Sequence, residues 1–255
     1  MQLTGNTILV TGGNSGIGQA LASAFHSLGN TVIITGRRQD TLDATVASHP
    51  GMHAVVLDVA DPDAIQQVAR QLIQDSPALN AVIHNAGMMS EEDLKTGEVA
   101  TAEAHIATNL LGPIRLNSAL LPHLLTLPSA TVMTVTSGLA FVPLALNPTY
   151  SATKAAIHSY TQSLRYQLAD TPVQVIELAP PYVRTSLQGE RQANDPNAMP
   201  LDEFIAEVMQ ILKDDPAVTE VLVQRVHAQR FAERSGEYDV FFKRMNDMLR
   251  AARHG

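Results

Sequence analysis

A tyrosine and a lysine four residues apart are the side chains of this sequence with the clearest chemical potential. They are Tyr150 and Lys154, in the segment Tyr-Ser-Ala-Thr-Lys. On a helix this spacing directs both side chains to the same face. A nearby ammonium favours the phenolate, so we expect the pKa of Tyr150 to lie below its ordinary value of about 10. The pair could then give or take a proton near neutral pH, although an exposed helix pair would have the same spacing.

Seven short segments rich in Val and Ile supply the strands expected to position this pair. They show little alternation of polar and apolar residues, as expected for strands buried on both faces of a sheet. Helical patterns lie between them. This alternation predicts an α/β fold, a doubly wound parallel sheet of about seven strands with helices on both faces in three αβα layers. The predicted strands are Ile8–Thr11, Thr31–Thr35, Ala54–Val59, Ala81–His84, Ala130–Thr136, Val173–Leu178 and Val218–Val223.

The helices are predicted from apolar periodicity and from residues typical of helix ends. Gly29 has the place of a glycine that follows a helix. Asp61 followed by Pro62 is typical of a helix start. The predicted helices are Gln19–Leu28, Asp61 to about Gln74, Thr101–Leu125, Tyr150–Ala169 and Leu201–Leu212.

A glycine-rich turn, residues 11–18, follows the first predicted strand and reads Thr-Gly-Gly-Asn-Ser-Gly-Ile-Gly. Gly12 would make the tight turn, Gly16 would let the backbone approach a pyrophosphate, and Gly18 would allow close packing of helix on sheet. The backbone N–H groups and the helix dipole would favour an anion there. The glycine spacing differs from the common dinucleotide fingerprint, but its place between a strand and a helix predicts a nucleotide site.

The end of the second predicted strand indicates which nucleotide would bind. Sites for NAD place Asp or Glu there to hold the ribose 2′-hydroxyl. Here the strand ends in Gly36-Arg37-Arg38, so two guanidiniums stand where a carboxylate would be. Because Arg makes bidentate phosphate contacts, we interpret the pair as a 2′-phosphate site and expect NADP(H), with NAD(H) possible. The alternative is a solvated pair of arginines in a turn.

Composition and length narrow the class of protein. We expect residues 1–255 to form one domain. A net charge of −8 argues against nucleic-acid and anionic-membrane partners. The chain has no Cys, and its nine His are scattered without the spacing of a zinc motif, so we expect no metal. No apolar run reaches the length of a membrane span, and the N-terminus lacks a signal-peptide pattern, so we expect a cytoplasmic protein.

Together these features resemble the classical short-chain dehydrogenases/reductases, and the remainder of the chain is similar to a bacterial subgroup, the DltE-type oxidoreductases. The matching motifs occur in family order over the first two thirds of the chain. They are the Thr11–Gly18 turn, Asp58-Val59 after the third strand, Asn85-Ala86-Gly87 after the fourth, Asn109, Ser137 after the fifth, and Tyr150 with Lys154.

The resemblance implies a Rossmann-type fold and a role for each of these residues. Tyr150 would be the general acid/base, and Lys154 would lower its pKa and hold the nicotinamide ribose. Ser137 would hydrogen-bond the substrate oxygen, and Asn109 would position a water in a proton relay through Lys154. The implied cofactor-binding residues are Gly12, Asn14, Ser15, Gly16, Ile17, Gly18, Arg37, Arg38, Asp58, Val59, Asn85, Ala86, Gly87, Tyr150, Lys154, Pro180, Val183 and Thr185.

Two positions depart from the family pattern. His84 stands where Asn is usual, and it either contacts the adenine side or ends the strand as a structural histidine, which we favour. Pro181 stands where Gly is usual; because Pro fixes φ and lacks an N–H, we expect a nicotinamide loop of different shape. A loop and helix region near 186–215 is expected beside the substrate, and its segment Gln188–Pro200 could be a lid or a mobile surface loop. Residues 91–93 (Glu-Glu-Asp) are interpreted as a solvated turn.

The function implied is hydride transfer between NADP(H) and a small-molecule carbonyl/alcohol substrate. Transfer to a carbonyl creates an alkoxide, which needs a proton and nearby donors. The alternative is a catalytically silent protein of the same fold that senses nucleotide or acts as a scaffold. A C-terminal helix near 236–251 would extend an interface or cover the substrate pocket.

A homodimer or homotetramer is expected. The resemblance implies it, because the predicted helices Thr101–Leu125 and Tyr150–Ala169 correspond to those that pair across a twofold axis in the family. These helices also carry more apolar surface than one sheet face is expected to cover. The apolar residues are Ile114, Leu116, Leu120, Leu121, Leu124, Ile157, Leu164 and Leu168.

Overall fold

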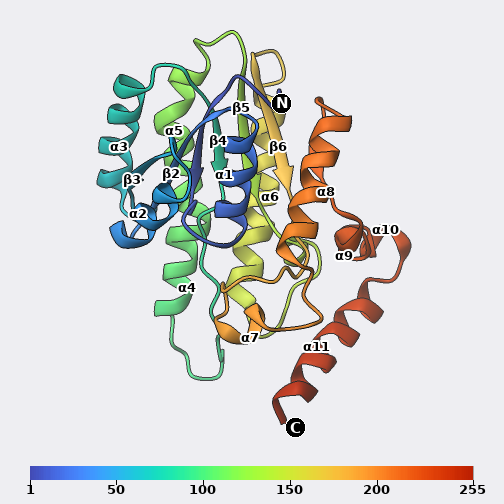
Figure 1. Ribbon diagram of the computed structural model, residues 1–255. Coiled ribbons are helices and arrows are strands. Elements are labelled where there is room, and N and C mark those ends of the chain that lie inside the picture. Colours follow the sequence, from blue (N-terminus) through green and yellow to red (C-terminus); the bar gives the residue numbers. More distant parts are fainter. Residues whose placement is uncertain (255) are drawn as a thin grey trace.

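A parallel sheet of seven strands forms the centre of the protein, in the order β3-β2-β1-β4-β5-β6-β7 (Figure 1). The computed structural model describes residues 1–254 and the side chains of residues 1–250, so Gly255 and the side chains of residues 251–254 lie outside the described part. The strands are β1 (Thr7–Thr11), β2 (Thr31–Gly36), β3 (His53–Val56), β4 (Leu79–His84), β5 (Ala130–Val135), β6 (Val173–Leu178) and β7 (Glu220–Val221). The predicted parallel sheet is confirmed.

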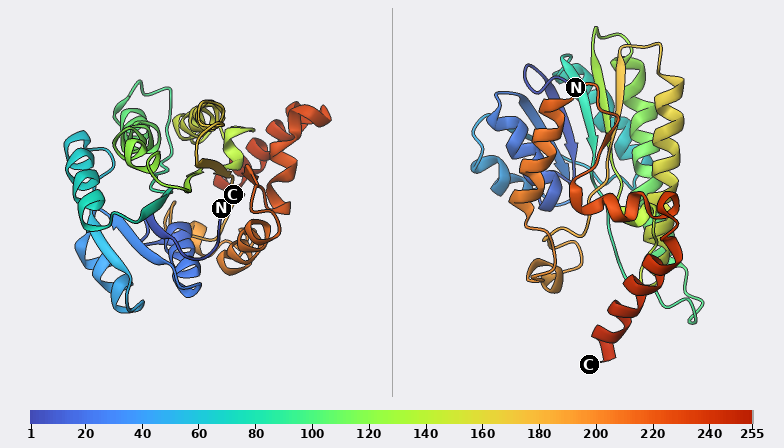
Figure 2. Two further views of the ribbon diagram at one scale, coloured as in Figure 1. Left: turned by 90° about the horizontal axis from the view of Figure 1, so that it is seen from above. Right: turned by 90° about the vertical axis from the view of Figure 1, so that its right-hand side faces the viewer.

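Helices cover both faces of this sheet (Figure 2). Phe25 of α1 and Phe204 of α8 are fully buried in the apolar cluster on one face. Leu72 of α3, Leu120 of α5 and Leu164 of α6 belong to the cluster on the other face. The helices are α1 (Gly16–Ser27), α2 (Gln39–Ala47), α3 (Pro62–Asp75), α4 (Ala100–His105), α5 (Gly112–Leu124), α6 (Pro148–Gln167), α7 (Glu190–Ala193), α8 (Leu201–Asp214), α9 (His227–Arg230), α10 (Ala232–Ser235) and α11 (Tyr238–His254). The predicted three layers are therefore confirmed.

Gly29 and Asp61 have the helix-end roles that the sequence predicts for them. Gly29 follows the last residues of α1 with φ of 82°, a conformation that glycine adopts readily. The side chain of Asp61 accepts hydrogen bonds from the backbone N–H groups of Asp63 and Ala64, at 2.9 and 3.1 Å, and Pro62 begins α3. Such a cap stabilises a helix by about 1 kcal/mol.

The predicted helix Thr101–Leu125 is interrupted. A π-helical turn, Ile106–Leu111, separates α4 from α5. Pro113 has no N–H to donate to the carbonyl four residues earlier, so the regular bonding pattern cannot pass through this position. Gly112 lies against Val59: a Cβ placed on it would come within 2.8 Å of the Val59 carbonyl oxygen. Asn109 lies within the π turn.

Three further elements differ from expectation. Helix α2 was not expected, because its sequence is polar and only Leu42 and Thr45 are buried. Strand β3 ends at Val56, and Leu57 leaves it while donating a hydrogen bond to the Gly36 carbonyl at 2.9 Å. Strand β7 has two residues, where six were expected.

The apolar surface invoked for assembly is mostly internal. Ile114 and Leu121 are partly exposed, but the other six residues of the set are buried within this chain: Leu116, Leu120, Leu124, Ile157, Leu164 and Leu168. The argument that a partner must cover them is therefore wrong, because the sheet and the neighbouring helices already do so.

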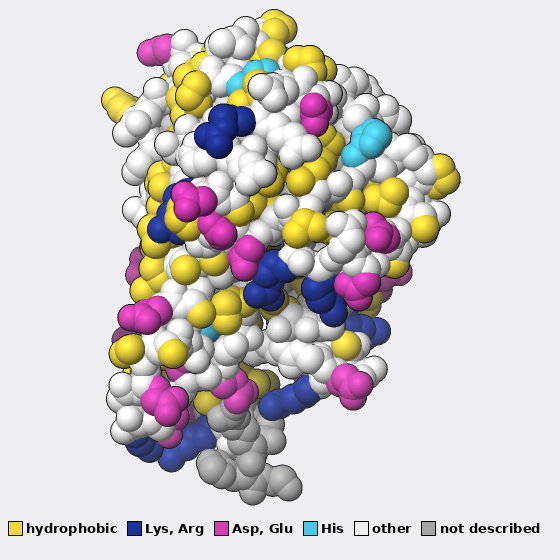
Figure 3. All heavy atoms as spheres, turned by 90° about the vertical axis from the view of Figure 1, so that its left-hand side faces the viewer, with side chains coloured by type: hydrophobic (Ala, Val, Ile, Leu, Met, Phe, Trp, Pro, Cys, Tyr) yellow, Lys and Arg dark blue, Asp and Glu magenta, His cyan; other side chains and the backbone are white. Residues whose placement is uncertain are grey.

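The outer surface is mixed in character. On the face of Figure 3, which lies on the side of α2 and α3 in Figure 1, Lys and Arg side chains occur in separate places among acidic and hydrophobic ones. Helix α11 extends away from the sheet (Figures 1 and 2). Within residues 1–254, no helix combines the length and apolar character needed to cross a membrane.

Candidate active site

The residues singled out by the sequence gather at the carboxyl ends of neighbouring strands. The glycine-rich turn follows β1, Asn85 follows β4 and Ser137 follows β5. Because these strands are parallel and adjacent, their ends lie at one edge of the sheet. The start of α6 brings Tyr150 to the same region, where its phenol interacts with the side chain of Ser137.

The glycine-rich turn is built closely around Asn85. The side-chain amide of Asn85 donates hydrogen bonds to the carbonyls of Thr11 and Gly12, at 3.0 and 3.2 Å. A Cβ on Gly18 would occupy the position of this amide, and one on Gly12 would come within 2.9 Å of the Cα of Ala86. Gly12 also has φ of 64°. Gly12 and Gly18 must therefore lack a side chain, because a Cβ at either position would collide with Ala86 or Asn85.

The hydroxyl of Thr11, the first residue of the glycine-rich turn, has a role that the sequence argument did not assign. It accepts hydrogen bonds from the backbone N–H groups of Asn85 and Ala86, at 3.0 and 3.1 Å. It thereby joins the ends of β1 and β4. Its only signal in the sequence is its position at the end of a predicted strand, immediately before the first glycine.

The N-terminus of α1 is suited to an anion. Gly16 has φ of 53°, and Ser15 stands at the N-cap without a side-chain capping bond to any described residue. The described first turn contains no acidic residue, and Ile17 packs against the core below. Free N–H groups at the positive end of a helix dipole bind phosphate groups, so this turn fits a pyrophosphate.

Asn14 places the arginine pair beside this turn. Its amide donates a hydrogen bond to the Thr41 hydroxyl at 2.7 Å, and that hydroxyl donates to the Arg38 carbonyl at 3.0 Å. The side chain of Asn14 also lies against Gly36, where a Cβ would collide with it. Arg37 and Arg38 are both exposed. Both guanidiniums could therefore contact a ligand that binds at the glycine-rich turn and extends over the end of β2.

Asp58 and Val59 follow β3 at the same edge. The Asp58 carboxylate accepts a hydrogen bond from the Ala60 N–H at 2.9 Å. Val59 is buried against Gly112 at the start of α5. Gly87 faces the π turn, since a Cβ on it would come within 3.3 Å of the Asn109 Oδ1.

The four expected catalytic residues are all buried: Asn109, Ser137, Tyr150 and Lys154 are 2 to 8% exposed. The Lys154 ammonium donates a hydrogen bond to the Val135 carbonyl at 2.8 Å and lies 5.6 Å from the centre of the Tyr150 ring. Asn109 bonds both backbone groups of Met88, at 2.9 Å each, and its amide donates to the Thr153 hydroxyl at 3.3 Å. The site is thus assembled from β5, α6 and the π turn.

Burial governs the protonation of the central pair. It raises the pKa of Tyr150 to about 12, although the hydrogen bond with Ser137 opposes the shift. Burial also lowers the pKa of Lys154 to about 8. The expectation that the pKa of Tyr150 lies below its ordinary value is therefore wrong for the protein's own groups, because removal of the phenolate from water outweighs its stabilisation by neighbours.

The loop after β6 returns to the glycine turn. Thr185 lies beside Gly16, where an added Cβ would be 3.5 Å from the Thr185 Cβ. Val183 is buried, and its carbonyl accepts a hydrogen bond from the Gln192 amide at 2.8 Å. The Pro180 carbonyl accepts one from the N–H of Gly138 at 2.8 Å. The loop therefore connects the turn with the segment that follows Ser137.

His84 is a structural histidine, as favoured from the sequence. It is buried, and its Nε2 lies 2.7 Å from the Oδ1 of Asn117. Burial lowers the pKa of His84 to about 4, so the ring is neutral at physiological pH. The hydrogen bond connects the end of β4 with α5.

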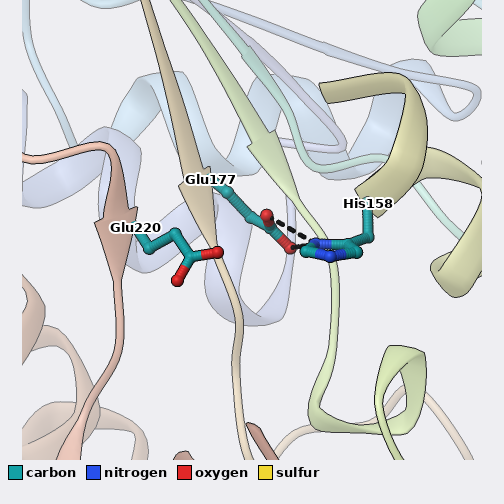
Figure 4. Close-up of side chains that lie close together, drawn as sticks. All are labelled: His158, Glu177 and Glu220. Atoms are coloured by element: carbon teal, nitrogen blue, oxygen red, sulfur yellow. Dashed lines mark hydrogen bonds and ion pairs between the residues drawn. The ribbon is translucent and has the colours of Figure 1, made fainter. Parts of the chain in front are cut away.

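His158, Glu177 and Glu220 lie close enough together to suggest a metal site (Figure 4). Each is engaged with another side chain. The Nδ1 of His158 lies 2.8 and 2.9 Å from the Glu177 carboxylate oxygens, one of which also accepts a hydrogen bond from Thr136 at 2.7 Å. Arg230 pairs with Glu220 through two nitrogens, at 3.0 and 3.3 Å. The guanidinium supplies the positive charge that an ion would bring, so the donor set fits an ion-pair network better than a metal.

Comparison with known proteins decides the family. The family model "short chain dehydrogenase" matches residues 6–196. The Bacillus subtilis protein named "Uncharacterized oxidoreductase DltE" is 39% identical over 96% of this chain and 98% of its own length. The chain belongs to the short-chain dehydrogenase family. It is accordingly an NAD(P)-dependent oxidoreductase, and its similarity to the DltE protein confirms the subgroup indicated by the sequence.

Solved structures share the fold. A short-chain dehydrogenase from Sphingobium yanoikuyae in complex with NADPH superposes with a TM-score of 0.79 at 23% identity, covering 93% of this chain and 95% of that one. A short-chain dehydrogenase/reductase from Burkholderia phymatum in complex with NAD gives 0.77 at 20% identity, covering 91% and 92%. Both forms of cofactor therefore occur among proteins with this fold.

The lowered pKa of Lys154 predicts a pH-dependent stability. The ordinary pKa of this group is 10.5 and its folded value is about 8, so the unfolded chain binds the proton more tightly. Stability from this group is smallest below pH 8 and rises with pH. Between pH 7 and pH 10 the free energy of unfolding of the wild type should rise relative to Lys154→Met by about 2–3 kcal/mol.

Urea denaturation followed by circular dichroism at each pH measures this difference. Tyr150 is present in both proteins, so its ionisation in the unfolded chain near pH 10 cancels from the comparison. Lys213→Met, on the exposed side of α8, is the matched control and should follow the wild type. If the stability difference between the wild type and Lys154→Met stayed constant from pH 7 to pH 10, the lowered pKa of Lys154 in the folded protein would be contradicted.

Proposed function

We propose that this protein is an NADP(H)-dependent oxidoreductase that transfers a hydride between the nicotinamide and a carbonyl/alcohol substrate, with Tyr150 as general acid/base. The observation that carries the proposal is the buried meeting of Ser137, Tyr150 and Lys154 at the strand edge that also carries the glycine-rich turn. Location in the cytoplasm remains the sequence-based expectation.

The chain's own residues would handle the proton. A bound nicotinamide supplies or accepts the hydride. With a pKa of about 12, the Tyr150 hydroxyl keeps its proton at neutral pH and can donate it to the developing alkoxide. The Ser137 hydroxyl can stabilise the same oxygen by a second hydrogen bond. Lys154 keeps positive charge beside the ring, which opposes the cost of leaving a phenolate there.

The cofactor would be held along the edge of the sheet. The α1 turn from Gly12 to Gly18 fits the pyrophosphate, and Arg37 and Arg38 are exposed beside it. The segments Asp58-Val59 and Asn85–Gly87, together with Pro180, Val183 and Thr185, border the same edge. Since the end of β2 offers guanidiniums in place of a carboxylate, a 2′-phosphate would be favoured over a free 2′-hydroxyl.

The alternative of a catalytically silent protein is less well supported. A catalytically silent protein would gain nothing from a buried ammonium, which costs stability even when one carbonyl accepts a hydrogen bond from it. Lys154 retains that cost, and Asn109, Ser137 and Tyr150 all remain around it.

Replacing Tyr150 by Phe should remove nearly all turnover and leave cofactor binding close to the wild-type value. The ring remains in place and only the transferable proton is lost. NADPH oxidation against a panel of carbonyl compounds gives the rates, and calorimetry gives cofactor affinity. Turnover in Tyr150→Phe comparable with the wild type on any shared substrate would refute the proton-transfer role.

The arginine pair should favour NADPH over NADH by about 1–3 kcal/mol, the scale of hydrogen bonds to charged groups. Calorimetry on Arg37→Ala should show a reduced preference with unchanged NADH affinity. Arg70→Ala, at an exposed position on α3, is the control. Equal affinity of the wild type for both cofactors, or an unaltered preference in Arg37→Ala, would argue against a 2′-phosphate site at these residues.

We retain a homodimer or homotetramer as the proposed assembly, on the family resemblance. The predicted interface helices, Thr101–Leu125 and Tyr150–Ala169, carry exposed apolar side chains that include Ile106, Leu125 and Tyr166. Light scattering at micromolar concentration should give two or four times the 27.4 kDa of one chain. A mass of one chain alone would rule the assembly out.

A further inference from the structure

The loop that follows β4 packs on the beginning of α6, next to Tyr150. The Glu92 carboxylate accepts hydrogen bonds from the backbone N–H of Thr149 at 3.1 Å and from the Thr149 hydroxyl at 2.8 Å. The Glu92 side chain is only 7% exposed, so the interpretation of residues 91–93 as a solvated turn is wrong for this residue. Its backbone N–H also donates to the Leu146 carbonyl at 3.0 Å.

Glu92 occupies a capping position that local residues leave open. Asn147 is the N-cap residue of α6, and its side chain makes no capping bond within the described chain. Pro148 has no N–H, so the N–H of Thr149 is the first donor of the helix that needs an acceptor. Glu92 supplies it from 57 residues earlier in the chain. A carboxylate at this end of a helix is also favoured by the helix dipole.

His105 packs on both Glu92 and Tyr150. Its Nε2 accepts a hydrogen bond from the Ser90 N–H at 3.0 Å. A backbone N–H can only donate, so in the neutral ring the proton is on Nδ1, which lies 3.4 Å from Glu92 Oε1. Burial lowers the pKa of His105, so the ring is neutral. The ring meets that of Tyr150 edge to face, with centres 6.3 Å apart.

We propose that Glu92 is a positioning residue of the active site, which caps α6 through Thr149 and so holds Tyr150 at the substrate oxygen. The inference rests on the proposed function only for its catalytic consequence. Thr149 and Tyr150 are consecutive, so movement of the first turn of α6 moves the phenol directly. A displacement of about 1 Å at a reacting group costs roughly 100-fold in rate.

Glu92 acts on geometry rather than on charge. The pKa of Tyr150 is raised by burial of its own side chain and lowered by the hydrogen bond with Ser137. Removal of Glu92 should therefore lower kcat and leave the pH at which the rate changes, and the cofactor affinity, as in the wild type. A variant that merely unfolds would lose all of these together.

The test compares Glu92→Ala, Glu92→Gln and Thr149→Val with Glu98→Ala, which removes a carboxylate from an exposed position in the same loop. Hydrogen exchange followed by mass spectrometry monitors the peptide at residues 147–153, and NADPH oxidation gives kcat and KM. Exchange in that peptide should be about 10-fold faster or more in Glu92→Ala, the ratio expected for the loss of a bond to a charged acceptor. Glu98→Ala should match the wild type.

Turnover provides the second readout. We expect kcat to fall about 10- to 100-fold in Glu92→Ala with KM within about 3-fold. Glu92→Gln retains one acceptor oxygen and should fall less, as should Thr149→Val. The double variant Glu92→Ala/Thr149→Val should be no slower than Glu92→Ala alone, because both changes remove one interaction.

The outcomes separate this inference from the proposed function. Wild-type exchange at residues 147–153 in Glu92→Ala would overturn the cap, whether or not a substrate is known. Faster exchange with wild-type kcat would overturn the positioning role. A wild-type protein that turns over no carbonyl would count against the proposed function, while the exchange experiment would still decide whether Glu92 holds the start of α6.

Discussion

The hydrogen bond from the Lys154 ammonium to the Val135 carbonyl is the interaction on which the site depends. Val135 is the last residue of β5, and Ser137 follows two positions later. Lys154 lies one helical turn after Tyr150. This bond therefore joins the strand that carries the serine to the helix that carries the tyrosine. A buried charge is tolerated only with such a partner, so the requirement to satisfy the ammonium also sets the distance between the two hydroxyls.

The glycine-rich turn meets a similar requirement with different groups. Asn85 uses its amide to satisfy two carbonyls of the turn, and Thr11 uses its hydroxyl to satisfy two N–H groups of the next loop. Each strand end thus satisfies backbone groups of the other through one side chain, Thr11 after β1 and Asn85 after β4. The N–H groups at the start of α1 keep no such partner among the described side chains. The ends of β1 and β4 are consequently held in place by hydrogen bonds, whereas the N–H groups at the start of α1 remain available to bind an anion.

Much of this could be predicted from the sequence, for a physical reason. Strands buried on both faces are continuous apolar runs, so the segments around Leu9 or Val132 are visible without a structure, and the turn after them follows. The length of Val218–Val223 as a strand was overestimated, because apolar residues mark burial and not pairing. Helix α2 has few buried residues to reveal it. The direction of the pKa shift at Tyr150 depends on burial, which the spacing from Lys154 does not contain. Glu92 was misread because its partner is distant in the chain.

Both edges of the sheet are short: β3 has four residues and β7 has two. An exposed strand edge is a template on which another chain can add a strand, and proteins limit this hazard by shortening such edges. Beyond β7, Arg230 binds Glu220 and also lies over the rings of Phe141 and Phe231, 4.8 and 5.5 Å from their centres. The segment after the sheet thus covers the shorter edge. The protein should accordingly resist open-ended, strand-by-strand polymerisation for as long as that covering segment stays in place.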